Sequence, residues 1–453
     1  MTGSGFRVLL PVAAMLARGA SRPERRRRPL LVGCSALATF FLLGAVNQLL
    51  IRGTTVTQWA GLVSEEDLRP GTALGLALLV VPVLALLHQA GRVTQAARER
   101  RLAALRLAGA TPGDVRLLGA VEAVRAGTAG AVIGSLGYVA AQRIAMAVLH
   151  VHDTGRYAVP LWPIPLVVAV VVAAAVVTSL RVSRRVVVSP VRVTRRASRP
   201  APAAVTLILL PLGVLVMVVG GQTQDVDKVG VPLFYLGGAL TAVGVAAGAG
   251  RLILASARLA GRWARTPETL LAARALEADP RAASRTMAVV GLVVAGGTGS
   301  AVIEWDVLQQ AAVDHAGVDL FWLVSIGSTW LGLLFALLVA VTALVVHQAE
   351  VLLEDGRSTA ALAAAGVPVA ALRRTALRRT IIAATPVCAA AALATAVGMA
   401  AGLYTSASWG LAAWMAARAL LMVAVAIASA SAVTLVSNRF LTRAAAPDRL
   451  RAE

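Results

Sequence analysis

The fold of this chain is decided by residues 95 to 137, which read QAARERRLAALRLAGATPGDVRLLGAVEAVRAGTAGAVIGSLG. The first part mixes arginine with leucine at helical spacing, which predicts a basic surface helix with one apolar stripe. Gly109 stands where a helix end favours a residue with positive φ. Thr111, Pro112 and Asp114 then supply an N-cap hydroxyl, a first-turn proline and an N-terminal carboxylate, which together start a second helix. We therefore predict a helical elbow that leads directly into an apolar helix.

The second helix of this stretch turns apolar and carries glycine at regular intervals. Small residues let helices approach closely in lipid, where packing rather than apolar burial holds them together. We expect four glycines to pack this span on its neighbours, namely Gly127, Gly130, Gly134 and Gly137. The residues expected to form the first elbow are Arg98, Glu99, Arg101, Leu102, Leu105, Arg106, Gly109, Ala110, Thr111 and Pro112.

A weaker copy of the elbow, AALAAAGVPVAALRRTALRR, occupies residues 360 to 379. It aligns Gly366 with Gly109 and places Pro368 one position before the equivalent of Pro112. Such an internal repeat predicts a duplicated architecture. The second elbow is expected to use Arg357, Leu362, Gly366 and Pro368, with Gly398 and Gly402 as packing glycines in the span that follows.

Composition places the chain in a membrane. Hydrophobic residues make up 58% of it and charged residues only 14%, and the apolar runs reach the length of about 20 residues that a bilayer requires. The fold class predicted is an all-α polytopic membrane protein. The formal net charge of +21 fits arginines that set membrane topology, so no nucleic-acid partner is expected. Cys34 and Cys388 lie in apolar runs and are expected to be inert packing residues.

Ten spans are predicted from the apolar runs. They cover approximately residues 30–51, 71–87, 117–140, 161–180, 203–220, 231–250, 286–302, 321–346, 381–404 and 417–436. Most lysine and arginine residues then lie on one side, and most tryptophans lie near the other interface. The positive-inside rule therefore predicts that both elbows and both termini are cytoplasmic.

The repeat and the spans together predict a domain organisation. Six spans separate the starts of the two elbow-bearing units, and an even number makes the units parallel, related by an axis along the membrane normal. The predicted parts are a cytoplasmic interfacial helix (1–29), a first four-helix unit (30–200), a two-helix connector (201–252), a cytoplasmic amphipathic segment (253–285), a second four-helix unit (286–440) and a cytoplasmic tail (441–453). In the amphipathic segment, residues 266–268 should start a helix and Pro280 should end it.

Several kinds of chemistry have no support in the sequence. A P-loop needs a lysine at the phosphates, whereas the one lysine, Lys228, is predicted on the outer side. The central parts of the spans are almost uncharged, which disfavours an ion-coupled secondary transporter. His88 and His347 lack further ligands at metal spacing. We therefore predict no catalytic residues, no metal site and no ATPase activity in this chain.

Two repeated elbows suit a dimeric partner in the cytoplasm. Their arginines and leucine stripe could dock a protein surface. The alternative is that each elbow lies on anionic membrane lipid, to which the same side chains could bind.

A charged helix, the turn at Leu105–Ala110, Glu122 and the glycines of residues 127–137 form a recognisable pattern. In this pattern the chain resembles FtsX-like permeases, the membrane subunits of MacB-type (type VII) ABC transporters. The resemblance is specific over residues 72–190 and weaker over residues 321–437. The arrangement of ten helices is similar to the duplicated, single-chain branch of the family, which includes bacitracin-export-type permeases.

The resemblance implies that the elbows are coupling helices that dock on separate ATP-binding subunits, two copies per chain. ATP and Mg²⁺ would then be held by those partners, and this chain would carry no cofactor. It also implies a multi-pass protein of a bacterial plasma membrane that exports or extracts a substrate by mechanotransmission. Because the outer segments are short, a lipidic, amphipathic or peptide substrate is expected. A transmitter that regulates a cell-envelope protein and a secondary transporter remain the alternatives.

Overall fold

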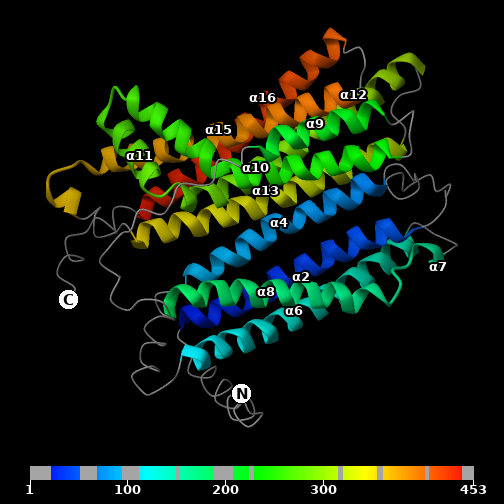
Figure 1. The fold of residues 1–453 in the computed structure, drawn as a ribbon, viewed down its shortest axis with the longest axis horizontal. Coiled ribbons are helices and arrows are strands. Elements are labelled where there is room, and N and C mark those ends of the chain that lie inside the picture. Colours follow the sequence, from blue (N-terminus) through cyan, green and yellow to red (C-terminus); the bar gives the residue numbers. More distant parts are fainter. Residues whose placement is uncertain are drawn as a thin grey trace. The chain divides into compact units, whose positions relative to one another are not determined.

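The computed structural model describes residues 22–51, 69–93, 112–148, 154–187, 208–223, 229–314, 320–354, 361–403 and 408–440. Within these ranges the chain is almost entirely helical and contains no strand (Figure 1). The same ranges contain nine helices long and apolar enough to cross a membrane, and a shorter apolar helix, α9. The prediction of an all-α polytopic membrane protein is therefore confirmed.

The chain folds into two compact units. The first unit comprises residues 1–53 and 76–197, and the second comprises residues 54–75 and 198–453. Helices of the first unit are α2 (Arg22–Leu50), most of α4 (Arg69–Val93), α6 (Pro112–Val148), α7 (Thr154–Tyr157) and α8 (Pro163–Val187). Helices of the second unit are α9 (Leu209–Gln222), α10 (Gly230–Arg262), α11 (Pro267–Ala278), α12 (Pro280–Asp314), α13 (Leu320–Glu354), α15 (Val369–Leu403), α16 (Trp409–Ser437) and the short 3₁₀ helix η3 (Asn438–Phe440).

Several helices run further than the apolar runs predict. The third span was expected to end at residue 140, but α6 continues to Val148. Residues 303–319 were expected to lie outside the seventh span, whereas α12 continues to Asp314. Arg22–Pro29 was assigned to a separate interfacial helix, but these residues begin α2. Hydropathy marks where a helix leaves the hydrocarbon, and the backbone hydrogen bonds of the helix continue past that point.

The first unit is built on a close approach of α6 to α2, and α8 packs on both (Figure 1). A Cβ added at Gly130 would lie 2.6 Å from the Cβ of Ser35, and one at Gly134 would lie 2.9 Å from the Cα of Ala36. Either distance is shorter than real Cβ contacts, so only glycine permits this spacing.

The remaining glycines that were expected to pack helices behave differently from one another. Gly127 makes ordinary contact with α8, because a Cβ there would lie 3.4 Å from the Cβ of Ala175. Gly137 has nothing within 4 Å of an added Cβ, so it does not make the close contact expected of it. It lies seven residues after Gly130, at a point of α6 where the space is open.

The second unit repeats the packing pattern of the first. In the first unit α2 packs on α6 and α8, and α6 packs on α8; in the second, α12 packs on α15 and α16, and α15 packs on α16. These are the helices that the internal repeat makes equivalent. In addition, α13 contacts α12 and α16.

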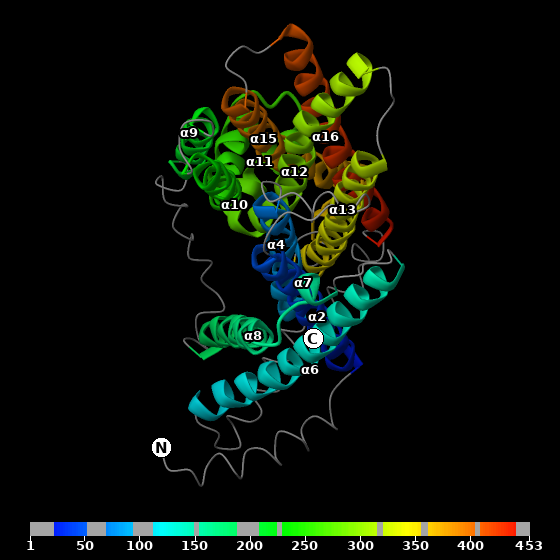
Figure 2. The same cartoon turned by 90° about the vertical axis from the view of Figure 1, so that its right-hand side faces the viewer.

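The connector helices α9 and α10 pack tightly on each other and on α15 (Figures 1 and 2). Gly398 and Gly402 of α15 face this pair: an added Cβ would lie 2.8 Å from the Sδ of Met217 and 3.2 Å from its carbonyl oxygen, respectively. Gln222 donates a hydrogen bond of 2.6 Å to the carbonyl of Ala401. The connector is therefore an integral part of the second unit.

Candidate functional site

The second elbow has the turn that the sequence predicts for it. Residues 361–364 are helical, and the chain then turns through Gly366, which has a φ of 89°. The amide of Val367 donates to the carbonyl of Leu362 at 3.0 Å, and the amide of Gly366 donates to the carbonyl of Ala363 at 3.0 Å. This pair of bonds is a Schellman motif, which ends a helix through a residue in the left-handed region. Glycine enters that region without a steric cost.

The chain re-enters a helix directly after the turn. The carbonyl of Pro368 accepts hydrogen bonds from the amides of Ala371 and Leu372, at 2.9 and 3.3 Å, and α15 begins at Val369. Leu362 is 40% exposed on the surface of the elbow. The second elbow is therefore an exposed turn that leads directly into a helix long enough to span a membrane.

The other elbow residues are described only in part. Pro112 begins α6, in agreement with its expected first-turn position. The remaining candidates lie outside the described residues, namely Arg98, Glu99, Arg101, Leu102, Leu105, Arg106, Gly109, Ala110, Thr111 and Arg357.

Helix α11 begins and ends at the predicted signals. Thr266 is its N-cap residue, with an extended backbone (φ −132°, ψ 144°), and Pro267 is its first residue. The helix ends at Ala278, and Pro280 both prevents its continuation and starts α12. Three small or apolar residues of α11 are buried, Ala272, Ala273 and Leu276, and the helix packs on α10 and α15.

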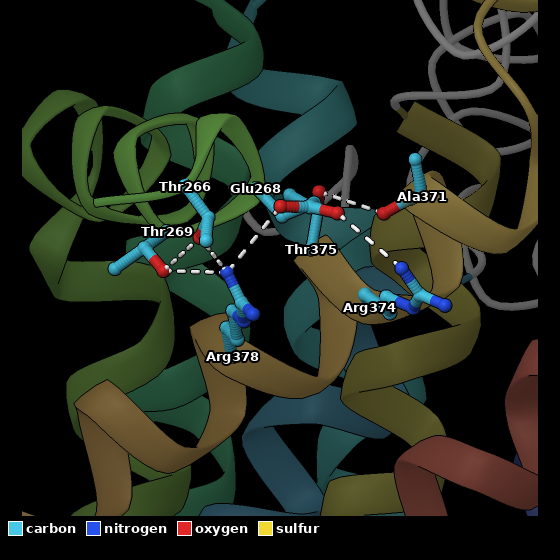
Figure 3. A network of polar contacts seen from close by, with 7 residues as sticks. All are labelled: Thr266, Glu268, Thr269, Ala371, Arg374, Thr375 and Arg378. Atoms are coloured by element: carbon cyan, nitrogen blue, oxygen red, sulfur yellow. Dashed lines mark hydrogen bonds and ion pairs between the residues drawn. The ribbon is translucent and has the colours of Figure 1, made fainter. Parts of the chain in front are cut away.

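The start of α11 is held by two arginines from α15 (Figure 3). Arg378 donates to the hydroxyl of Thr269 at 2.6 Å and to that of Thr266, and its guanidinium lies 3.4 Å from a carboxylate oxygen of Glu268. Arg374 lies 3.8 Å from the other oxygen of Glu268. The hydrogen bond from its own backbone amide, and then the charges of Arg378 and Arg374, lower the pKa of Glu268. This carboxylate is therefore ionised at neutral pH.

These contacts connect the elbow to two long helices. The turn at Gly366 leads into α15, and within three further turns α15 carries Arg374 and Arg378, which hold α11. Helix α11 is separated from α12 by Asp279 alone. The second elbow is thus connected to α15 directly and to α12 through α11.

A buried ion pair at the other end of the same helices was missed by the sequence reasoning. Glu304 of α12 is 7% exposed and pairs with Arg418 of α16. The indole of Trp330, from α13, donates to Glu304 at 3.0 Å, and Ser300 donates at 3.2 Å. The Arg418 guanidinium lies 4.8 Å from the centre of the Trp330 ring and 5.4 Å from that of Trp414.

The ion pair joins α12, α13 and α16 and lies within candidate spans. It was missed because α12 was expected to end at residue 302, which placed Glu304 in an outer segment. The depth of Arg418, near the outer end of the tenth predicted span, was the signal that could have suggested a carboxylate partner at a matching depth. The interior of the second unit therefore contains a pair of charged residues that the sequence analysis did not predict.

In the part of the chain that the structure describes, no three His, Cys, Asp or Glu side chains gather in a way that could hold a metal ion. Cys34 and Cys388 are buried and carry free thiols, in keeping with packing positions.

Fold and site together define a polytopic helical membrane protein in which an exposed elbow is continuous with a long transmembrane helix. Residues 72–190, which contain α6, most of α4 and α8, and the first elbow, match the family model for the FtsX-like permease C-terminal domain. This segment is an FtsX-like permease domain, and it indicates a membrane permease subunit of an ABC-type system. Subunits of this family serve transport rather than catalysis and generally work with ATP-binding subunits. No curated protein and no solved structure matches the chain.

Proposed function

We propose that this chain is the permease subunit of an ABC transporter in which both elbows dock on separate cytoplasmic ATP-binding subunits. The observation that carries the proposal is the FtsX-like match over residues 72–190, because this segment contains the first elbow and the helices on both sides of it. The ordered turn at Gly366 supports the same role for the second elbow. Two docking surfaces in one chain suit two copies of the ATP-binding subunit.

The mechanism proposed is mechanotransmission. Helix α15 runs without a break for 35 residues from the elbow, a length of roughly 50 Å at 1.5 Å per residue. A movement of the ATP-binding subunits at the elbow would therefore tilt or shift α15 along its whole length. Helix α12 would follow, because α11 is fastened to α15 by Arg378 and Glu268.

The substrate we propose is lipidic, amphipathic or peptidic and is exported or extracted from the outer part of the bilayer. Only residues 315–319 separate α12 from α13, and only residues 51–68 separate α2 from α4. Connections of this length leave no room for a separately folded domain with its own core. A substrate reached from the membrane fits this architecture better than one captured by a large outer domain.

Copurification from native cells tests the proposal. The tagged chain, solubilised in mild detergent, should retain a protein with a Walker A motif, identified by mass spectrometry. Gly366→Val forces a β-branched residue into the left-handed region at a cost of about 1–2 kcal/mol, so recovery of the ATP-binding protein should fall about fivefold or more. Combining Arg98→Glu with Gly366→Val should lower the recovery of the ATP-binding protein further. Gly327→Val is the control, since an added Cβ there meets nothing within 4 Å.

Two results would count against the proposal: a wild-type chain that retains no ATP-binding protein, or elbow variants that retain as much of it as Gly327→Val does. Stimulation of ATP hydrolysis in the reconstituted complex gives a second measurement, which should fall in parallel with recovery.

An ion-coupled carrier is the second candidate function, and the Glu304–Arg418 pair is the observation that favours it. Ionisable residues within spans often mark ion or proton pathways. Here each charge already faces the other, and Trp330 and Ser300 also bind the carboxylate. A carrier would transport its substrate in vesicles without ATP, whereas the proposed permease would require ATP and its partner subunit.

A further inference from the structure

A cavity of about 290 Å³ lies between the start of α15 and the end of α16 in the second unit. Its lining combines three guanidinium groups, one carboxamide and two leucines, from Arg373, Arg374, Leu377, Leu435, Asn438 and Arg439. A lining with several arginines and an apolar wall fits a ligand that carries both an anionic group and an apolar part.

The walls of the cavity are fixed by hydrogen bonds. The side-chain amide of Asn438 is buried and donates to the carbonyl of Arg373 at 3.4 Å, which ties the end of α16 to α15. One turn further into the helices, the hydroxyls of Thr380 and Thr434 lie 2.9 Å apart, and Gln348 of α13 donates to Thr434 at 3.1 Å. Three helices are therefore joined by hydrogen bonds beside the cavity.

The cavity lies at the depth of lipid headgroups. Leu377 is four residues before the predicted start of the ninth span, and Leu435 is at the end of the tenth. At about 1.5 Å per residue, Arg439 extends roughly 5 Å beyond the tenth span and Arg374 roughly 10 Å beyond the ninth. The polar layer of a bilayer is about 5–8 Å thick on each side, so Leu377 and Arg439 lie within the headgroup layer. Leu435 stands at the edge of the hydrocarbon, and Arg374 lies just beyond the headgroups.

The charges at this position favour a phosphate ester. Guanidinium groups bind phosphate oxygens through paired, charge-assisted hydrogen bonds. Arg374 shares its charge with Glu268 at 3.8 Å, and this carboxylate belongs to α11 and is not part of the lining. Basic pockets between membrane helices bind anionic headgroups for this reason.

We propose that this cavity binds the headgroup of an anionic phospholipid, with the phosphodiester at Arg373 and Arg439 and the glycerol and first methylenes against Leu377 and Leu435. The apolar wall distinguishes a lipid from free phosphate, which would leave the leucines without contact. A bound lipid would bridge the first turns of α15, directly after the elbow, to the end of α16.

Native mass spectrometry of the purified full-length chain in detergent tests the proposal. With phosphatidylglycerol added, a lipid adduct should persist at activation energies that remove phosphatidylcholine. Arg439→Gln and Arg373→Gln should each reduce the retained phosphatidylglycerol about tenfold, because a charge-assisted phosphate contact is lost. Arg439→Lys should lie between these variants and wild type, since lysine keeps the charge but loses the paired geometry.

The control is Arg274→Gln, an exposed arginine of α11 in the same unit, which should retain the lipid as wild type does. Melting midpoints of the lipid-free proteins show whether the variants are folded. If a glutamine variant unfolds, lipid retention is compared between Arg439→Lys and the wild-type chain instead. Equal retention of the two lipids, or equal loss in Arg274→Gln and Arg439→Gln, would overturn the proposal. Displacement of the lipid by millimolar glycerol phosphate would instead identify a soluble phosphate ligand and also overturn it.

Discussion

Removing the carboxylate of Glu304 should destabilise the second unit strongly. In the Glu304→Ala variant Arg418 keeps its contacts with the rings of Trp330 and Trp414, but its guanidinium loses the opposite charge and Trp330 loses its hydrogen-bond acceptor. Breaking a buried ion pair by removing one partner typically costs about 3–5 kcal/mol. The retained cation–π contacts are worth about 0.5–2 kcal/mol and are present before and after the change, so they do not offset this loss.

Thermal unfolding in detergent is the measurement. For a unit of this size about 1 kcal/mol corresponds to roughly 2 °C, so Glu304→Ala should lower the midpoint by roughly 6–10 °C. The double variant Glu304→Leu, Arg418→Met removes both charges at similar volume and should recover most of that loss, since an apolar replacement of a buried pair is often neutral or stabilising.

The reasoning would be refuted if Glu304→Ala unfolded within about 1 °C of the wild-type chain. It would equally fail if the double variant were as unstable as the single one, because the loss would then come from packing and not from an uncompensated charge.

Two further predictions concern α6 and α11. Gly134→Leu should lower the stability of the first unit by about 1–3 kcal/mol, since the added side chain meets the backbone of α2 at Ala36, whereas Gly137→Leu, which enters open space, should leave the unfolding midpoint unchanged. The lowered pKa of Glu268 means that its contacts with Arg378 stabilise α11 at every pH above the ordinary value of 4.5, and this contribution fades as the pH falls below that value and is lost once the folded-state pKa is passed. The protection factors of the α11 amides, which are corrected for the intrinsic pH dependence of exchange, should therefore fall in acid in the wild-type chain, and they should be nearly independent of pH over the same range in Glu268→Gln.

Much of the architecture follows from local sequence. Apolar runs of the length of a bilayer predict the membrane helices, because an unpaired backbone group in hydrocarbon is too costly for any other structure here. Gly366 and Pro368 predict the turn of the second elbow for a similarly local reason. Glycine can enter the left-handed region, and proline is tolerated at the start of the next helix because the first amides of a helix have no partner within it. The same holds for Thr266 and Pro280 at the ends of α11.

Other features depend on which helices meet, and no local pattern contains that information. Gly134 and Gly137 have the same sequence signal, yet only Gly134 of the two faces the backbone of α2, because Gly137 lies on an exposed part of α6. The contact with α2 continues at Tyr138, whose ring packs on Phe40. Glu304 and Arg418 are 114 positions apart, and only the packing of α12 on α16 brings them together in a place where water cannot screen their charges. The sequence therefore determined the membrane helices and the elbow turn, which local backbone chemistry controls. The tertiary structure alone decided the glycine contacts, the buried ion pair and the basic cavity, because each requires side chains from helices that are distant in the chain.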